Sequence, residues 1–455
     1  MAGLPASATP FRLGGFQEVA VFTPEAFSHF GRHVKDEWIV EALAAARGHA
    51  TLRRRKLPVK RTLWLVIGMG LFRDRSIHEV AERLELALPG KDGEVGVAAS
   101  AIPRARERLG AEAVERVFAL TAGHWMATGA EAHAWRGLTL LGIDGSHLRI
   151  PDTEENEAAF GRPTTGRSVS GYPQVRLVGL FGLRSRVLGA MSVGAYGTGE
   201  LTLVEPLWAR VPDHSLTFLD RGFLSWLPLW QLSTTGEERH WVVRAKANLR
   251  MRKMRRLGPG DWLVEIAVPR ALRAAHPEMP EVLQARCVQG RVKGFRPYTI
   301  LTSALDAGRY PGAELAQMYR ERWECELAYD ELKTHLLERR EALRSKSPDG
   351  IRQEIAGLGL AYNLVRLEMA EVAAQLGVPP TRISFLHTLH AVQDFMGWAW
   401  VTSPGALPRR VESHDRRVRL YLLPERRTTR RYPRHVKIKM SNYARNYGRA
   451  GAMLK

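Results

Sequence analysis

The chain has 455 residues, enough for two to four domains at the usual size of about 150 residues each. Hydrophobic residues make up 45% and charged residues 25%, values typical of folded proteins, which excludes wholesale disorder. Lys and Arg number 67 against 47 Asp and Glu, so the formal net charge is +20. Such an excess predicts a polyanionic partner, with nucleic acid as the first candidate.

Several classes of protein are excluded by what the sequence lacks. Cys287 and Cys325 stand far apart and outside any motif, so neither a disulfide framework nor a zinc-cysteine site is expected. The longest apolar run, 63–72, is shorter than the roughly 20 residues of a membrane span. There is no export signal and no Gly-rich nucleotide-binding loop. We therefore expect a cytoplasmic protein that binds no membrane and hydrolyses no nucleotide.

The first 136 residues predict an α-helical module. Residues 36–47 are amphipathic, 61–72 are apolar, and a capping box from Ser76 to Glu79 opens a further helix. A basic run separates the first two helices: Arg53, Arg54, Arg55 and Lys56. This run fits either a DNA contact or a solvated turn, and the sequence leaves both open.

Short apolar runs from residue 137 onward predict a sheet. The predicted strands are 138–143, 174–181, 187–193, 216–219 and 241–246. Helix-like stretches at 200–210 and 225–233 separate the last three strands. This order suits an α/β protein with a ribonuclease-H-like catalytic core. Further β signals at 262–269, 280–289 and 297–305 predict a β-rich insertion over about 247–310.

Long periodic stretches at 313–340 and 350–376 predict two helices. The tail after Trp400 is basic, with 15 Lys and Arg against three Asp and Glu in residues 408–455, and we expect it to be weakly structured unless bound. The predicted domains are a helical N-terminal DNA-binding domain (1–136), a catalytic domain (137–345) and a helical C-terminal region with a basic tail (346–455).

Two aspartates stand where a core strand ordinarily has no acid. Asp144 follows the apolar residues 140–143 in the first strand, and Asp220 follows 216–219 at the end of the fourth. One such residue alone is more often a turn cap, but two on adjacent strands indicate metal ligands. Carboxylates that hold two Mg²⁺ ions suit phosphodiester chemistry, because the ions activate the nucleophile and neutralise the leaving oxygen.

A third group of candidates lies on the helix predicted from residue 313. Tyr319, Glu326 and Lys333 are seven residues apart, so an α-helix brings them to one face, with Arg322 beside them. Glu326 offers a metal ligand, whereas Arg322 and Lys333 offer positive charge to phosphates. The alternative is a solvated helix face with ordinary charge pairs.

These four residues form the pattern Y-(2)-R-(3)-E-(6)-K, which resembles the signature of the DDE transposases of insertion-sequence family four. The segment Asp144-Gly145-Ser146 is similar to the first aspartate motif of that family, and Asp220-Arg221-Gly222-Phe223 is similar to the second. Residues 53–58 and 71–74 resemble its helical N-terminal domain, and 357–366 resemble a later helix. The resemblance covers most of the chain and implies a bacterial, nucleoid-associated transposase.

The resemblance also implies the reaction and the partners. Such an enzyme nicks the terminal inverted repeats of its element, forms and reopens a DNA hairpin, and transfers the ends into target DNA. Two Mg²⁺ ions, for which Mn²⁺ substitutes, fall to Asp144, Asp220 and Glu326. Phosphate contacts fall to the Tyr, Arg and Lys of the pattern. The partners are double-stranded DNA, as element ends and as target, and a second copy of the chain in the synaptic complex.

A DNA hairpin requires one base to leave the stack, and aromatic rings commonly hold such a base. Trp323 and Tyr298 are the candidates. Tyr298 is explained equally well as a strand aromatic packed in the β-rich insertion.

Two other functions share these features. A metal-dependent DNA nuclease or resolvase on the same fold would cleave without strand transfer, but the insertion and Lys333 argue against it. A domesticated DNA-binding protein would keep the fold without catalysis, but three converging acids repel one another and have no use without a metal.

Overall fold

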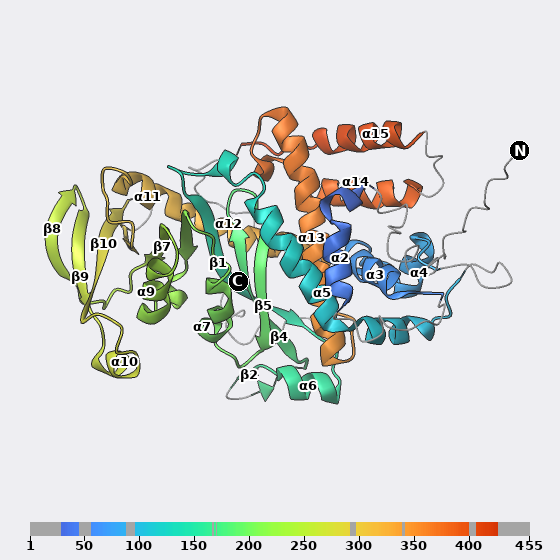
Figure 1. The fold of residues 1–455 in the computed structure, drawn as a ribbon, viewed down its shortest axis with the longest axis horizontal. Helices are drawn as coiled ribbons and strands as arrows, with labels where there is room; N and C mark the ends of the chain where they lie inside the picture. Colours follow the sequence, from blue (N-terminus) through green and yellow to red (C-terminus); the bar gives the residue numbers. More distant parts are fainter. Residues whose placement is uncertain are drawn as a thin grey trace, which may run out of the picture. The chain divides into compact units, whose positions relative to one another are not determined.

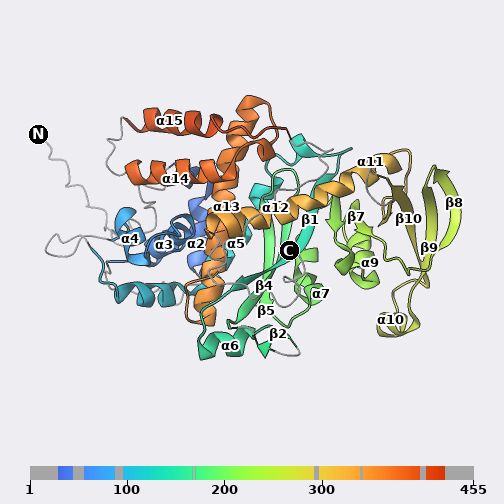
Figure 2. The same cartoon turned by 180° about the vertical axis from the view of Figure 1, so that it is seen from behind.

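The computed structural model describes residues 29–44, 56–87, 96–165, 168–169, 171–291, 297–338, 342–399 and 406–425. A large mixed sheet and a group of helices beside it make up this part of the chain (Figures 1 and 2). None of the helices in these ranges is long and apolar enough to cross a membrane.

The strands are β1 (Thr139–Arg149), β2 (Thr164–Thr165), β3 (Ser168–Val169), β4 (Gln174–Gly182), β5 (Leu188–Ala195), β6 (Ser215–Leu219), β7 (Arg239–Arg244), β8 (Arg252–Gly258), β9 (Asp261–Ala267), β10 (Val282–Gly290) and β11 (Tyr298–Thr302). Nine of them form one sheet in the order β5-β4-β1-β6-β7-β11-β10-β9-β8, and β2 pairs with β3 separately. β1 pairs antiparallel with β4 and parallel with β6, and β6 pairs parallel with β7. The five strands predicted for the core correspond to β1, β4, β5, β6 and β7.

The helices before the sheet are η2 (Phe30–His33), α2 (Asp36–Leu43), α3 (Val59–Leu71), α4 (Ile77–Arg83), α5 (Ala101–Ala127) and η3 (Glu131–His133). Those between its strands are α6 (Glu154–Phe160), α7 (Glu200–Leu203), α8 (Glu205–Trp208), η4 (Arg221–Phe223), α9 (Trp226–Thr234) and α10 (Arg270–Ala275). Those after it are α11 (Gly312–Met318), η5 (Tyr319–Arg322), α12 (Trp323–Asp330), η6 (Glu331–Leu336), α13 (Pro348–Leu376), η7 (Pro380–Arg382), α14 (Phe385–Ala399) and α15 (Leu407–Arg419).

The helix α13 connects the N-terminal helices to the sheet. It packs along α3 and α5 and also contacts β5 (Figure 1). Two glycines permit a close crossing with α3, because a Cβ on Gly357 would lie 2.5 Å from Cγ1 of Val66 and one on Gly70 would lie 2.8 Å from Cβ of Ala361. Helices from the two ends of the chain therefore share one hydrophobic core with the sheet.

The predicted β-rich insertion extends the sheet at one edge. β11 pairs antiparallel with β7, and β10, β9 and β8 follow outward (Figure 1). The sequence pattern does not reveal β8, because this edge strand begins with five consecutive exposed residues and lacks apolar alternation. Inside the insertion the guanidinium of Arg286 is fully buried, and its Nε donates to Oδ1 of Asp261 at 2.8 Å.

Two expectations for the C-terminal third are wrong. Residues 313–340 do not form one α-helix, because the 3₁₀-helix η5 separates α11 from α12, and α12 continues into the π-helix η6. The tail after Trp400 is not weakly structured throughout, since α15 is a regular helix. Its Val411, His414 and Val418 recur at helical spacing and are, with Asp415, its less exposed positions, and α15 packs on α14 and α13. This apolar stripe is short and lies among arginines, which hides it in the sequence.

Candidate active site

Asp144 and Asp220 lie side by side on neighbouring parallel strands. In the register of β1 with β6, Ile143 pairs with Leu219, and each aspartate is the next residue along its strand. Asp144 is half-buried inside β1, which continues to Arg149, whereas Asp220 is exposed directly after β6. The parallel pairing thus brings together two acids that are 76 positions apart in the sequence.

The surroundings of Asp144 leave space for another acidic side chain near its carboxylate. The backbone N–H of Gly145 donates to Oδ1 of Asp144 at 2.9 Å, and the Tyr329 hydroxyl donates to the Asp144 carbonyl oxygen at 2.9 Å. A Cβ at Gly145 would lie only 2.4 Å from Oε1 of Glu200, the first residue of α7. Gly145 therefore makes room for a fourth carboxylate beside Asp144, one that the sequence-based prediction missed.

The pKa of Asp144 is raised from 3.8 to about 6. Burial is the main cause, and the negative charges of Glu326 and Glu200 raise the pKa further. The Gly145 N–H and the Arg322 guanidinium act in the opposite direction but do not offset these effects. The site thus carries negative charge that a cation would compensate.

Arg322 links Glu326 to Asp144, because its guanidinium contacts both carboxylates. The Nη2 of Arg322 donates to Oε1 of Glu326 at 2.6 Å, and its Nη1 lies 3.8 Å from Oδ2 of Asp144. The helix α12 packs against β1, and Figure 2 shows the segment from α11 to α12 crossing the sheet from the insertion towards α13. The predicted proximity of Asp144, Arg322 and Glu326 is therefore present in the structure.

Tyr319 joins the same segment to the end of β6. Its side chain is buried, and its hydroxyl donates to the carbonyl oxygen of Leu219 at 3.0 Å, directly before Asp220. Burial raises the pKa of Tyr319 to about 12, so the hydroxyl keeps its proton and remains a donor. In this arrangement the phenol contacts the strand that carries Asp220.

The other residues predicted for the site differ in how far their side chains are exposed to solvent. Lys333 is half-buried in η6, near His147 of β1: the pKa of His147 is lowered mainly by burial, then by the charges of Arg176 and Lys333. Trp323 is 53% exposed at the start of α12. Tyr298 is half-buried, and its hydroxyl donates to the Ala316 carbonyl oxygen at 2.6 Å.

The basic run of the N-terminal module is described only in part. Lys56 is exposed and leads into α3, among the helices and not on the sheet. Arg53, Arg54 and Arg55 lie outside the described residues.

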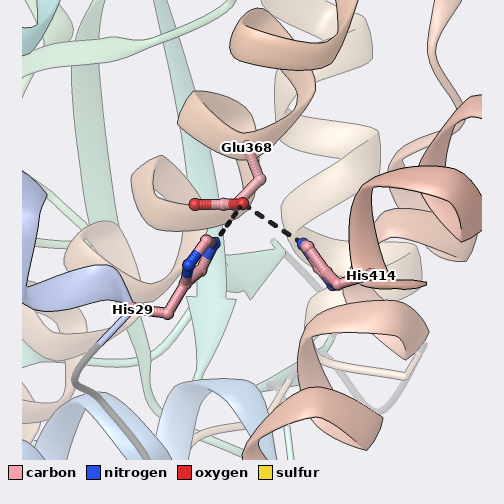
Figure 3. Close-up of side chains that lie close together, drawn as sticks. All are labelled: His29, Glu368 and His414. Carbon is pink, nitrogen blue, oxygen red and sulfur yellow. Dashed lines mark hydrogen bonds and ion pairs between the residues drawn. The ribbon is translucent and has the colours of Figure 1, made fainter. Parts of the chain in front are cut away.

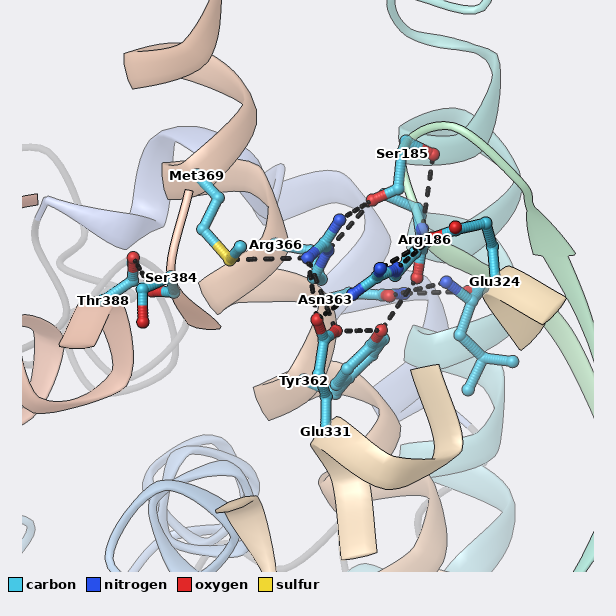
Figure 4. Close-up of polar contacts among 12 residues, drawn as sticks. Ser185, Arg186, Glu324, Glu331, Tyr362, Asn363, Arg366, Met369, Ser384 and Thr388 are labelled. Carbon is cyan, nitrogen blue, oxygen red and sulfur yellow. Dashed lines mark hydrogen bonds and ion pairs between the residues drawn. The ribbon is translucent and has the colours of Figure 1, made fainter. Parts of the chain in front are cut away.

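A buried ion-pair network holds α12 and η6 in place (Figure 4). Arg186, in the turn between β4 and β5, contacts Glu331 of η6 and donates from Nη2 to Oε2 of Glu324 at 2.6 Å. On the other side of Glu331, the Tyr362 hydroxyl lies 3.1 Å from Oε2 and Nη1 of Arg366 lies 3.4 Å from it. In the sequence, the only indication of this network is the seven-residue spacing of Glu324 and Glu331, which places both acids on one face of a helix.

The chemistry of the three predicted acids fits a hard divalent cation. Asp144, Asp220 and Glu326 offer oxygen ligands that are at least partly exposed, as Mg²⁺-type ions require. Their ligand atoms do not all lie within 4.8 Å of one another; among the described residues that holds only for two sets around Glu368. Two ions about 3.5–4 Å apart need a wider ligand set than one ion does.

Comparisons with known proteins agree with this chemistry. Residues 24–119 match the family model "Insertion element 4 transposase N-terminal", and residues 135–364 match "Transposase DDE domain". The chain is 39% identical over 408 residues to the transposase InsG for insertion sequence element IS4 of Escherichia coli (strain K12), covering 90% of this chain and 91% of that protein. It is 34% identical over 238 residues to the putative transposase InsZ of the same organism, covering 51% and 77%.

Among solved structures, a piggyBac transposase synaptic complex with hairpin DNA aligns over 90% of this chain and 87% of that chain, at 12% identity and a TM-score of 0.42, which is too low for inference. The DDE-domain match covers half of the chain and contains Asp144, Asp220 and Glu326. The chain therefore belongs to the insertion element 4 family of DDE transposases, DNA-binding enzymes that depend on a divalent metal, cleave DNA and transfer its strands.

Proposed function

We propose that Asp144, Asp220 and Glu326 are the catalytic acids of this transposase and that they hold two Mg²⁺ ions, for which Mn²⁺ substitutes. The observation that carries the proposal is the placement of Asp144 and Asp220 on adjacent parallel strands, with Glu326 linked to Asp144 through Arg322. When bound, two such ions lower the pKa of an attacking water or 3′-hydroxyl and neutralise the leaving oxygen. The raised pKa of Asp144 supports the proposal, because a carboxylate cluster without a cation is electrostatically unfavourable.

We further propose that β1, β4, β5, β6 and β7 form a ribonuclease-H-like core, with residues 247–310 as an insertion. The support is their order in the sheet, β5-β4-β1-β6-β7, in which the first three strands are antiparallel neighbours and the last three are parallel. The helices before residue 137 would form the DNA-binding domain, and those after residue 345 would form a C-terminal region.

The residues around the acids are proposed to hold DNA. Arg322 already contacts both Asp144 and Glu326, so a phosphate held at these acids meets its positive charge. Lys333 adds a second cation on the same segment. Tyr319 was expected to contact phosphate as well, but its buried hydroxyl donates to Leu219, so its proposed role is to hold the segment with Arg322 and Lys333 against β6.

A hairpin intermediate requires an extruded base, and Trp323 is the better of the two aromatic candidates. Its ring is exposed next to Arg322, whereas the Tyr298 hydroxyl is occupied by Ala316 and its ring lies 6.1 Å from that of Tyr319. Base stacking on an aromatic ring contributes about 1–3 kcal/mol.

On this proposal the enzyme acts on the terminal inverted repeats of its own element by cut-and-paste movement. Two ends must be cut together, so the active form is a homodimer that holds both ends. The arginines before α3, with Lys56, and the basic tail would add contacts to the DNA backbone.

The deciding experiment measures cleavage of labelled DNA that carries the element ends, with Mg²⁺ or with EDTA. The wild type is expected to give hairpin and excised products only with Mg²⁺, and Glu326→Ala is expected to give none while still binding the DNA. Glu314→Gln, an exposed acid of α11 paired with Arg136, serves as a control that keeps the products. Cleavage by Glu326→Ala at the wild-type rate would contradict the assignment.

A further inference from the structure

A cluster of histidines surrounds one buried glutamate far along the chain from the catalytic acids. Glu368 lies on α13, and its side chain is 1% exposed. The Nε2 atoms of His29 and His414 lie 3.1 Å and 3.2 Å from the same oxygen, Oε2 (Figure 3). The three side chains come from the residue before η2, from α13 and from α15, so the cluster joins both ends of the described chain.

The donor set of this cluster has the chemistry of a transition-metal site. The ligand atoms of His29, Glu368 and His414 all lie within 4.8 Å of one another, and all three residues are buried. Two imidazole nitrogens and one carboxylate oxygen suit Zn²⁺ and related ions, whereas Mg²⁺ prefers oxygen ligands alone. The site thus differs in kind from that of the catalytic acids.

The second carboxylate oxygen of Glu368, Oε1, is bound by neighbouring side chains, so only Oε2 faces the two histidines. The Nε2 of His33 and the Nη2 of Arg32 each lie 3.1 Å from Oε1. Arg32 also donates to Glu371 at 2.6 Å, which balances its charge at the surface. Such outer contacts orient a carboxylate ligand and keep the remaining oxygen directed at the ion.

Aromatic rings pack against the cluster, and one of its histidines borders a small cavity. The rings of Phe30 and Phe395 each lie 5.0 Å from the ring of His29. His414 also lines a cavity of about 50 Å³ between α14 and α15, together with Trp398.

We propose that His29, Glu368 and His414 bind one divalent transition-metal ion of the zinc type, which fastens the η2 segment and α15 onto α13. The ligating imidazoles carry their proton on Nδ1. His29 therefore loses the hydrogen bond that its Nδ1 accepts from Nη1 of Arg32 at 3.4 Å. Arg32 keeps its hydrogen bonds to Glu368 and Glu371. The ion is structural, because three elements supply its ligands and the site is distinct from the DNA-cleaving acids.

The test uses the full-length chain freed of metal and titrated with Co²⁺ in excess Mg²⁺. The wild type is expected to develop the visible absorption of tetrahedral cobalt, to saturate near about one molar equivalent, and to lose the signal when Zn²⁺ is added. His414→Gln and Glu368→Gln are expected to lose that equivalent. His390→Gln, which changes an exposed histidine on α14, and Glu326→Ala, which changes the catalytic set, are expected to retain it.

A second readout is thermal unfolding. Zn²⁺ is expected to raise the Tm of the wild type and of His390→Gln but not that of His414→Gln, because an ion bound to the folded state alone stabilises it. If the wild type shows no cobalt absorption, the cluster is a metal-free hydrogen-bonded network and the proposal is overturned. That titration needs no variant, so it decides the matter even where His414→Gln does not fold. Equal cobalt signals in the wild type and a folded His414→Gln would overturn the proposal as well.

Discussion

At the scale of single residues, the site is organised around the electrostatics of Asp144. Its carboxylate is half-buried, its neighbours Glu326 and Glu200 are acids, and its pKa of about 6 lies above that of an unfolded aspartate. A folded-state pKa above the unfolded value means that ionisation of this group favours unfolding. The metal-free protein thus loses stability at Asp144 as the pH rises from about 4 through about 6.

We expect Asp144→Asn to be more stable than the wild type in EDTA at pH 8, by about 2–3 kcal/mol at roughly 1.36 kcal/mol per pKa unit. The gain should shrink as the pH falls and vanish well below 3.8, where the wild-type carboxyl is protonated in both states. Urea unfolding across this pH range measures it. Asp220→Asn changes an exposed side chain and should alter stability by less than about 0.5 kcal/mol. An Asp144→Asn protein that is no more stable than the wild type at pH 8 would argue against the electrostatic strain.

At the scale of elements, the network around Glu331 sets where α12 presents Glu326. Arg186 and Arg366 contact this one carboxylate from the β4–β5 turn and from α13, and both guanidiniums are buried. Removing one member of such a buried set leaves charge without compensation, which costs about 3–5 kcal/mol.

Glu331→Gln is therefore expected to lower the free energy of unfolding by about 3 kcal/mol and to reduce DNA cleavage through displacement of α12. Glu321→Gln is the matched control, because the pair of Glu321 with Arg184 is about a third exposed and should contribute less than about 1 kcal/mol. Denaturant titration compares the two variants. Equal losses would mean that the buried network is no more important than a surface pair.

The crossing of α13 with α3 depends on Gly357. A Cβ there would lie 2.5 Å from Val66 Cγ1 and 2.9 Å from the Val66 backbone oxygen, and the backbone cannot move aside as a side chain can. Gly357→Ala is expected to destabilise the protein by about 1–3 kcal/mol.

Gly123→Ala is the control for this prediction. Gly123 lies in α5, where an added Cβ meets nothing within 4 Å, so the substitution should stabilise the helix by about 0.5–1 kcal/mol. Thermal unfolding of both variants gives the sign of each effect, and a neutral Gly357→Ala would show that the two helices can separate at no cost.

At the scale of the whole molecule, charge governs the encounter with DNA. Residues 426–455 contain ten Lys and Arg and no acid, half of the formal net charge of +20. Each phosphate neutralised releases counterions, so affinity falls steeply with salt. A chain ending at Glu425 is expected to bind element-end DNA more weakly and with a smaller slope of log Kd against log salt. Fluorescence anisotropy over a salt series tests this, and an unchanged slope would place the phosphate contacts elsewhere.

The sequence by itself determined the family and the five strands β1, β4, β5, β6 and β7, and it predicted the three candidate acids and the further strands between residues 247 and 310. These features depend on local patterns: apolar strands that end in an acid, and a helix signature with fixed spacing. The predicted single helix is divided by η5 and η6, so the seven-residue spacing places Tyr319, Glu326 and Lys333 on three consecutive helical segments.

Only the tertiary structure decided which distant residues support the site. Glu200 reaches Asp144 because Gly145 has no side chain, and Arg186 meets Glu331 because the β4–β5 turn lies against η6. His29 and His414 converge on Glu368 although 385 positions separate them in the sequence. Such contacts arise from the tertiary packing of elements that are distant in the sequence, and no periodicity within one element encodes them.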